Sequence, residues 1–135
     1  MTDRYKQRLI SIGVNLDDTL DRFMGNESLY EKFLLKFLED KSFQQLEESI
    51  VFLQSKSFQY LDNDIKSQKI HDSFMWAHTL KGIADNMGFD CLLKILSPMT
   101  EKLRNKNTEK IQEDMENLKE QYNVLSCMIQ DSHTL

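Results

Sequence analysis

Residues 70–87 read IHDSFMWAHTLKGIADNM, and the rest of the chain can be interpreted outward from this helical pattern. A helix turns by about 100° per residue, which gathers the apolar positions of this stretch on one arc. That arc holds Ser73, Trp76, Leu80, Ile83, Ala84 and Met87. We therefore expect a helix over 70–87 that buries this arc in a core and ends at Gly88, a residue suited to a helix C-terminus.

Gly82 is unusual inside such a helix, because a glycine there costs about 1 kcal/mol relative to alanine. The same rotation places His78 roughly 160° from the centre of the apolar arc, and Gly82 lies one turn further along the same solvent-facing surface. Lys81 flanks this surface, and its long side chain can reach back toward His78. Core packing does not explain Gly82, so we favour access of another molecule to His78 as the reason.

Helical patterns also precede this stretch. We expect short helices over 1–12 and 16–24, with Asn15 and Asn26 as N-caps of the helices that follow them. An apolar stripe from Leu29 to Leu38 predicts a longer helix. We expect a break or kink at residues 40–42 and a further helix over 42–53. The polar stretch 54–69 leaves two interpretations open, a loop with a short helix or an early start of the next helix.

Two helices are expected after Gly88. Asp90 would cap the first, which runs to about Asn105 and contains Pro98, a residue that should kink it. Thr108 would cap the second, whose apolar stripe from Ile111 to Ile129 is close to a heptad. The prediction is an all-α fold in one domain, 1–135, with an N-terminal helical segment over 1–25. Residues 27–130 would form an antiparallel up-down four-helix bundle.

Composition agrees with this architecture and excludes several classes of function. The chain has 135 residues with one proline and four glycines, too few turn residues for a typical β fold. The net charge of −5 argues against nonspecific nucleic-acid binding, which needs a basic surface. No apolar run approaches the roughly 18 residues of a membrane span, and the polar N-terminus has no signal-peptide core, so we expect a cytoplasmic protein. Cys91 and Cys127 are isolated and are expected to be free thiols.

The combination of His78, Lys81 and Gly82 has a chemical interpretation. An exposed imidazole with an ordinary pKa near 6.5 is largely neutral at cytoplasmic pH, and its free ring nitrogen is a nucleophile. A phosphoryl group on that nitrogen would carry close to two negative charges, which a nearby ammonium would stabilise. A glycine one turn away removes the side chain that would block a bulky donor.

The segment from Ala77 to Gly88, AHTLKGIADNMG, resembles the signature of histidine-containing phosphotransfer (HPt) domains, roughly H-x-L-K-G-x-x-x-x-x-G. The match includes the histidine, the leucine, the lysine and both glycines at the family spacing. Residues 13–30 also resemble the first helices of that family, so that the resemblance covers most of the chain. The chain departs from the family in a longer segment between Leu53 and Ile70 and in Pro98.

The resemblance implies that His78 accepts a phosphoryl group from the phospho-aspartate of a receiver domain and passes it to another receiver. Lys81 would stabilise the phosphate, and Gly82 would admit the receiver's active-site loops. The receiver domains would belong to response regulators or hybrid sensor kinases and would supply the magnesium and the aspartate. The chain would then need no cofactor and would be a phosphocarrier rather than a kinase. A closed bundle with an exposed His78 is compatible with a monomer, which is the state we expect.

Four neighbouring residues have two interpretations each. His71 and Asp85 are solvated helix residues or contacts at the rim of a docking surface. Phe74 and Met75 either pack against the 54–69 segment or the N-terminal helix, or form an apolar docking patch around His78. A shared metal ion is not expected, because His71, His78 and Asp85 are spaced about 10.5 Å apart along the helix.

Two other functions remain open from the sequence. One is a helical adaptor that binds a receiver or a kinase without carrying phosphate. The other is a histidine domain that a separate kinase phosphorylates in trans. The chain has no P-loop, no glycine-rich nucleotide loop and no H-E-x-x-H motif, so an ATP-binding kinase domain within it is not expected.

Overall fold

A computed structural model describes residues 1–134 of the chain, with the side chains of residues 1–133. Every regular element in this range is a helix, so the predicted all-α class is confirmed for the described residues. The helices, in chain order, are α1 (Asp3–Ser11), α2 (Leu16–Arg22), α3 (Glu27–Glu39), α4 (Ser42–Leu53), α5 (Lys56–Gln59), α6 (Asn63–Met87), α7 (Asp90–Arg104) and α8 (Ile111–Thr134).

The N-terminal helices begin at polar caps. The hydroxyl oxygen of Thr2 accepts a hydrogen bond from the Tyr5 amide at 3.1 Å and caps α1, and Asn26 caps α3 by accepting from the Leu29 amide at 3.0 Å. Asn15 stands at the N-cap of α2, as predicted, although its side chain donates to Asp18 at 3.2 Å instead of accepting from the helix. The predicted N-cap positions of α2 and α3 are therefore confirmed.

The segment 54–69 combines both interpretations left open by the sequence. It contains the short helix α5, and α6 starts early, at Asn63. Asp62 explains this early start, because its carboxylate accepts a hydrogen bond from the Ile65 amide at 3.0 Å and caps α6. The break between α3 and α4 also lies where it was predicted, and there the Asp40 carboxylate accepts from the Ser42 amide at 2.8 Å.

Gly88 ends α6 in the left-handed conformation, with φ at 74°, which confirms the predicted C-cap. A β-carbon at this position would clash with the Thr19 hydroxyl and lie 2.6 Å from the Asn15 carbonyl oxygen. The Asn15 amide donates to the Gly88 carbonyl at 2.7 Å. Glycine is therefore required both by its conformation and by the close approach of α2, which fixes α2 against the end of α6.

Two predicted caps are wrong. Phe89, not Asp90, holds the N-cap position of α7, and Asp90 is the first residue inside that helix, where its carboxylate is favourable to the helix dipole. The last helix begins at Ile111, directly after Lys110 with its positive φ of 56°, so Thr108 lies outside the cap position. The carbonyl of Thr108 instead accepts from the Ile111 amide at 3.2 Å. Pro98 lies within α7, which is continuous through it.

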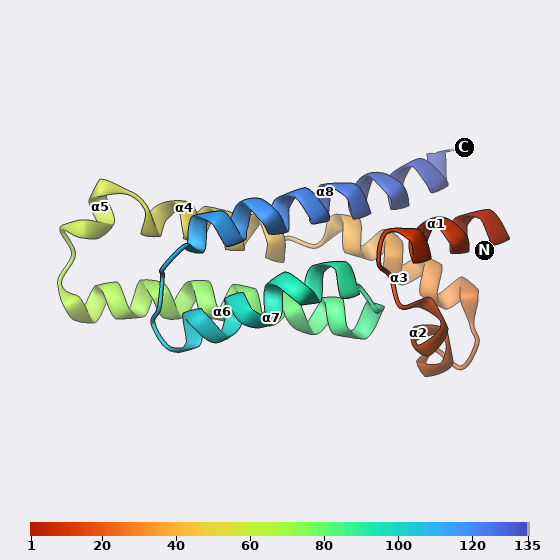
Figure 1. Ribbon diagram of the computed structural model, residues 1–135, viewed down its shortest axis with the longest axis horizontal. Helices are drawn as coiled ribbons and strands as arrows, with labels where there is room; N and C mark the ends of the chain where they lie inside the picture. The colour runs from red at the N-terminus through yellow and green to blue at the C-terminus, as the bar shows by residue number, and fades with distance from the viewer. Residues whose placement is uncertain (135) are drawn as a thin grey trace.

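The long helices run along the long axis of the molecule, and the chain reverses direction after α4, α6 and α7 (Figure 1). Helix α6 packs against α4 and α7, and α8 packs against α7, α3 and α4. The short helix α1 packs against α8 and α2. These helices share one apolar core, whose largest fully buried side chains include Tyr30, Phe89, Leu34, Leu46, Leu92 and Leu96.

The buried face of α6 is rotated slightly from the predicted one. Its buried residues are Ser73, Ala77, Leu80, Ala84 and Met87. Trp76, which was expected in the core, is 36% exposed, so that prediction is wrong. The small side chains of Ala77 and Ala84 are fully buried on the face that meets α4 and α7, and this turns the bulky indole to the edge of the helix.

Candidate functional site

His78 and Gly82 lie on the exposed face of α6, as the helical rotation predicted. A β-carbon built on Gly82 would meet no atom within 4 Å outside the neighbouring backbone of its own helix. No packing against another helix therefore requires a glycine at this position, and φ of Gly82 is not positive. In this fold, the effect of Gly82 is to leave the surface beside His78 open.

Lys81 lies beside these two residues and is half-buried. Among the described residues, no carboxylate forms an ion pair with its ammonium group. Its charge is therefore available to a negative group that arrives from outside. The neighbouring Thr79 hydroxyl is satisfied within the helix, because it donates to the Met75 carbonyl at 2.9 Å. The strip His78–Lys81–Gly82 thus combines a nucleophile, a free cation and an open surface.

Phe74 is the side chain that supports the His78 ring. Their ring centroids are 5.7 Å apart with an interplanar angle of 21°, and His71 lies at the same centroid distance from Phe74 with an angle of 32°. The guanidinium of Arg104, from the end of α7, lies 4.8 Å from the centre of the Phe74 ring. Phe74 is half-buried, and it links His78 to a second positive charge.

The other predicted docking residues differ in how exposed their side chains are. Met75 is 46% exposed and His71 is exposed, so both are accessible on this surface. The Asp85 side chain is exposed, and the backbone carbonyl of Asp85 accepts a hydrogen bond from the Arg22 guanidinium at 3.0 Å. This bond ties α2 to α6 close to Gly82. Phe74 is half-buried and packs against the core, and the Arg104 guanidinium lies over its ring.

A mainly apolar hollow of about 400 Å³ opens beside Gly82, between α2, α3 and α6. Ile83 and Asn86 of α6 form one wall of this hollow, which therefore begins directly after Gly82 in the helix. Phe33 of α3 lines the opposite side and is 42% exposed, although the sequence placed it in a core stripe. The complete lining is Arg22, Phe23, Phe33, Ile83, Asn86 and Met87.

Sequence reasoning missed Arg104, Arg22 and the aromatic side chains of this hollow. These residues come from α2, α3 and α7, far from His78 in the chain, and no local spacing connects them to it. A weak signal was available for Phe33, because its side chain lies at the edge of the α3 stripe rather than at its centre.

Among the residues that the structure describes, no three His, Cys, Asp or Glu side chains are placed to hold one metal ion. In the same part of the chain, no helix is both long enough and apolar enough to cross a membrane. The chain matches no model of a known protein family, no curated protein and no solved structure. The function must therefore be inferred from the chemistry of the site itself.

Proposed function

We propose that this chain is a cytoplasmic histidine phosphocarrier of a multistep two-component phosphorelay, with His78 as the phosphorylated residue. The observation that carries the proposal is the exposed His78 beside an open Gly82, with the unpaired Lys81 between them. In this proposal the antiparallel helices are the four-helix bundle of an HPt domain, with α3 and α4 together forming its first long rod and α6, α7 and α8 forming the others.

The transfer step needs little from the carrier itself. One nitrogen of the neutral His78 ring forms a bond to the phosphorus of an aspartyl phosphate, the bond from phosphorus to the carboxylate oxygen breaks, and the carboxylate leaves. Such transfers depend on positioning and on stabilising the charge of the phosphoryl oxygens. The stack on Phe74 restrains the His78 ring. Lys81, three residues along the same helix, offers a charge that forms no ion pair among the described residues.

Arg104 supports this proposal from a second helix. Its guanidinium lies 4.8 Å from the centre of the Phe74 ring, and its ion pair with Glu101, at 3.4 Å, joins two largely exposed side chains. Exposed pairs of this kind are worth about 1 kcal/mol or less, so Arg104 can turn toward a phosphoryl group at small cost. A phosphorylated His78 would then be accompanied by positive charge from both α6 and α7.

The partner in this proposal is a receiver domain that docks over the strip and the hollow beside it. The hollow offers Phe23, Phe33 and Ile83 to apolar side chains of the receiver, while Gly82 lets the receiver's loops approach His78. Met75 and His71 extend the accessible surface on the N-terminal side of His78, and Asp85 extends it on the other side.

The test is a phosphotransfer assay with purified receiver domains of the host, each phosphorylated on its aspartate. We expect at least one receiver to label the chain with an acid-labile phosphoryl group, and His78→Gln to abolish the label. His71→Gln is the matched control, because His71 is an exposed histidine that contacts the same Phe74 ring. Equal labelling of the wild type and His78→Gln would show that the proposal is wrong.

The same assay separates the two competing functions. Labelling by a partner kinase with ATP, in the absence of any receiver, would identify a histidine domain phosphorylated in trans. A His78→Gln variant that binds its partner and signals normally would identify an adaptor that carries no phosphate.

A further inference from the structure

A second cavity lies at the end of the molecule that holds α1 and the last turns of α8 (Figure 1). It has a volume of about 600 Å³, within the range typical of sites for small organic ligands. Helix α1 and the end of α8, which pack against each other, contribute most of its walls. Its lining consists of Met1, Thr2, Arg4, Tyr5, Arg8, Glu31, Ser132 and His133, none of which belongs to the His78 surface.

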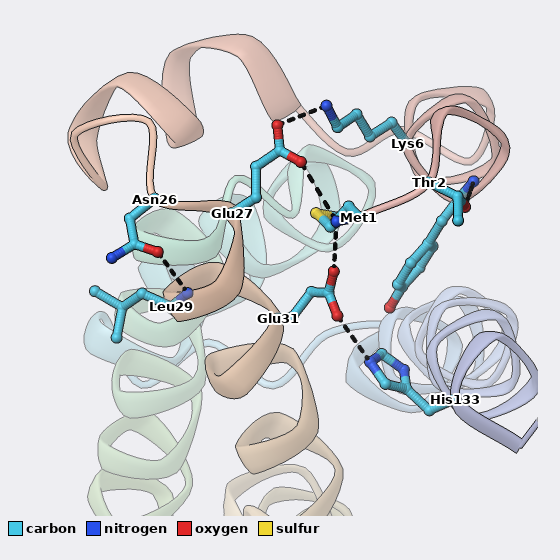
Figure 2. Close-up of polar contacts among 9 residues, drawn as sticks. Met1, Thr2, Lys6, Asn26, Glu27, Leu29, Glu31 and His133 are labelled. Atoms are coloured by element: carbon cyan, nitrogen blue, oxygen red, sulfur yellow. Dashed lines mark hydrogen bonds and ion pairs between the residues drawn. The ribbon is translucent and has the colours of Figure 1, made fainter.

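Two carboxylates near this cavity, those of Glu27 and Glu31, have cationic partners. The Glu27 carboxylate binds the Lys6 ammonium at 2.6 Å and the Met1 amino group at 3.4 Å, and Glu31 binds the same amino group at 2.9 Å (Figure 2). The hydrogen bond between Lys6 and Glu27 raises the pKa of Lys6 and lowers that of Glu27. The negative charge of this wall is therefore neutralised within the protein.

Arg4 and Arg8 lie one helical turn apart on α1, and both line the cavity. Within residues 1–133, neither guanidinium forms an ion pair. Within the described residues, the cavity wall therefore carries two positive charges that form no ion pair. Guanidinium groups bind carboxylates and phosphates through paired hydrogen bonds, so these charges favour an oxyanion.

The cavity also holds polar atoms without a partner. Tyr5 is only 7% exposed, and its hydroxyl has no hydrogen-bond partner among the described residues. Burial raises the pKa of Tyr5, so the hydroxyl keeps its proton and can donate a hydrogen bond. The His133 ring packs edge-on against Tyr5, with centroids 5.4 Å apart.

His133 is oriented by its backbone contact. Its Nδ1 atom lies 2.9 Å from the Ile129 carbonyl oxygen and therefore carries a hydrogen, because a carbonyl can only accept. Its Nε2 atom is buried without a hydrogen bond, 3.7 Å from the Glu31 carboxylate. Buried polar atoms are normally satisfied, so the Tyr5 hydroxyl, a donor without an acceptor, indicates that a polar ligand completes this site.

We propose that this cavity binds a small organic oxyanion, a carboxylate or phosphate monoester on an apolar body. Arg4 and Arg8 hold its negative group, the Tyr5 hydroxyl donates to one of its oxygens, and its apolar body lies against the Tyr5 ring and the Met1 side chain. A bare inorganic ion leaves most of the 600 Å³ unfilled, so the apolar body is part of the recognition. This site is independent of the phosphocarrier function proposed for His78.

The proposal can be tested by NMR titration of the isotope-labelled full chain with phenyl phosphate, benzoate, inorganic phosphate and benzylammonium. We expect saturable shifts of the Tyr5, Arg8 and His133 signals with phenyl phosphate, benzoate or both, and the stronger of the two identifies the preferred oxyanion. Inorganic phosphate should bind more weakly, and benzylammonium should not shift these signals. Absence of saturable shifts with both aromatic oxyanions, or equal shifts with benzylammonium, would overturn the proposal.

Variants then assign the binding to named groups. The double substitution Arg4→Gln and Arg8→Gln should weaken binding at least tenfold, and Tyr5→Phe, which keeps the ring and removes only the hydroxyl, should weaken it several-fold. Lys56→Gln is the control, because it removes an exposed cation on α5 at the opposite end of the molecule (Figure 1). Unchanged affinity in the double variant would overturn the proposal. Labelling of His78 should be the same in all of these variants, so failure of either proposal is recognised separately.

Discussion

Two substitutions of Gly82 can distinguish its effect on helix stability from its effect on access to His78. Gly82→Ala and Gly82→Gln should both raise the free energy of unfolding by about 0.5–1 kcal/mol, because both residues favour a helix more than glycine does. The new β-carbon meets no atom within 4 Å beyond its own helix backbone, so no strain opposes this gain. Urea denaturation measures the stability of each variant, and the receiver assay measures its transfer rate.

The two variants should differ in transfer. Gly82→Ala should keep most of the rate, whereas the longer side chain of Gly82→Gln should extend over the surface beside His78 and slow transfer about tenfold or more, in line with what misplacement of reacting groups costs. Asn123→Gln, on the exposed side of α8, is the control for a change in helix propensity away from His78. A Gly82→Gln variant that transfers as fast as the wild type would remove access as the explanation for this glycine.

Lys81 supplies charge rather than stability in this interpretation. Lys81→Gln should slow transfer about fivefold, which corresponds to the roughly 1 kcal/mol at the upper end for exposed charge pairs. The free energy of unfolding should not change, because Lys81 has no ion pair within the described residues. Single-turnover transfer from a phosphorylated receiver is the measurement, with Lys56→Gln as the charge control. Equal rates in both variants would mean that Lys81 does not assist the reaction.

At the scale of elements, Gly88 holds α2 against the end of α6. Gly88→Ala should lower the free energy of unfolding by about 2 kcal/mol or more, because a left-handed alanine costs about 1 kcal/mol and its β-carbon would also push Thr19 and Asn15 away. Gly25→Ala is a matched control, since Gly25 has the same φ of 74° but open space around it. Equal losses in the two variants, measured by urea denaturation, would show that the close approach of α2 contributes nothing.

The helices could largely be predicted from the sequence, because their signals are local. Apolar periodicity and caps such as Asn26 and Gly88 involve residues within one or two turns of each other. The caps at Asp90 and Thr108 were misplaced by a few residues, whereas the error at Trp76 came where a neighbouring helix decides the outcome. Trp76 fits the apolar arc of α6 by rotation alone, but the fully buried Ala77 sets the face that packs against α4 and α7.

The residues of the candidate site also fall into two groups, those with a local sequence signal and those without one. His78, Lys81 and Gly82 share one helix, so rotation alone predicted their common face. Arg104 reaches the Phe74 ring only because α7 packs back along α6, and this pairing of helices has no local signal. The hollow beside Gly82 depends on α2, which the contacts at Gly88 position.

At the scale of the whole molecule, groups in the core and packed against it keep their protons at high pH. Burial is the main cause that raises the pKa of Tyr5, Tyr30 and Tyr122, and it also raises the pKa of the Cys91 thiol. In the unfolded chain the tyrosines titrate near pH 10. Above that pH the unfolded state therefore binds fewer protons than the folded state, and stability falls as the pH rises.

This proton balance gives a prediction for the stability profile. The contribution of Tyr30 should be fully present below about pH 10 and should be lost above it by at most about 1.4 kcal/mol per pH unit. Tyr30→Phe should reduce this alkaline loss, although it also lowers stability at pH 8 by about 1 kcal/mol because the 2.9 Å hydrogen bond to the Met87 carbonyl is removed. The measurement is therefore the pH dependence of urea denaturation, not a single value. Tyr60→Phe, at a tyrosine that is 87% exposed, should leave the dependence unchanged. Parallel profiles for Tyr30→Phe and the wild type would show that the core tyrosine does not carry the alkaline loss.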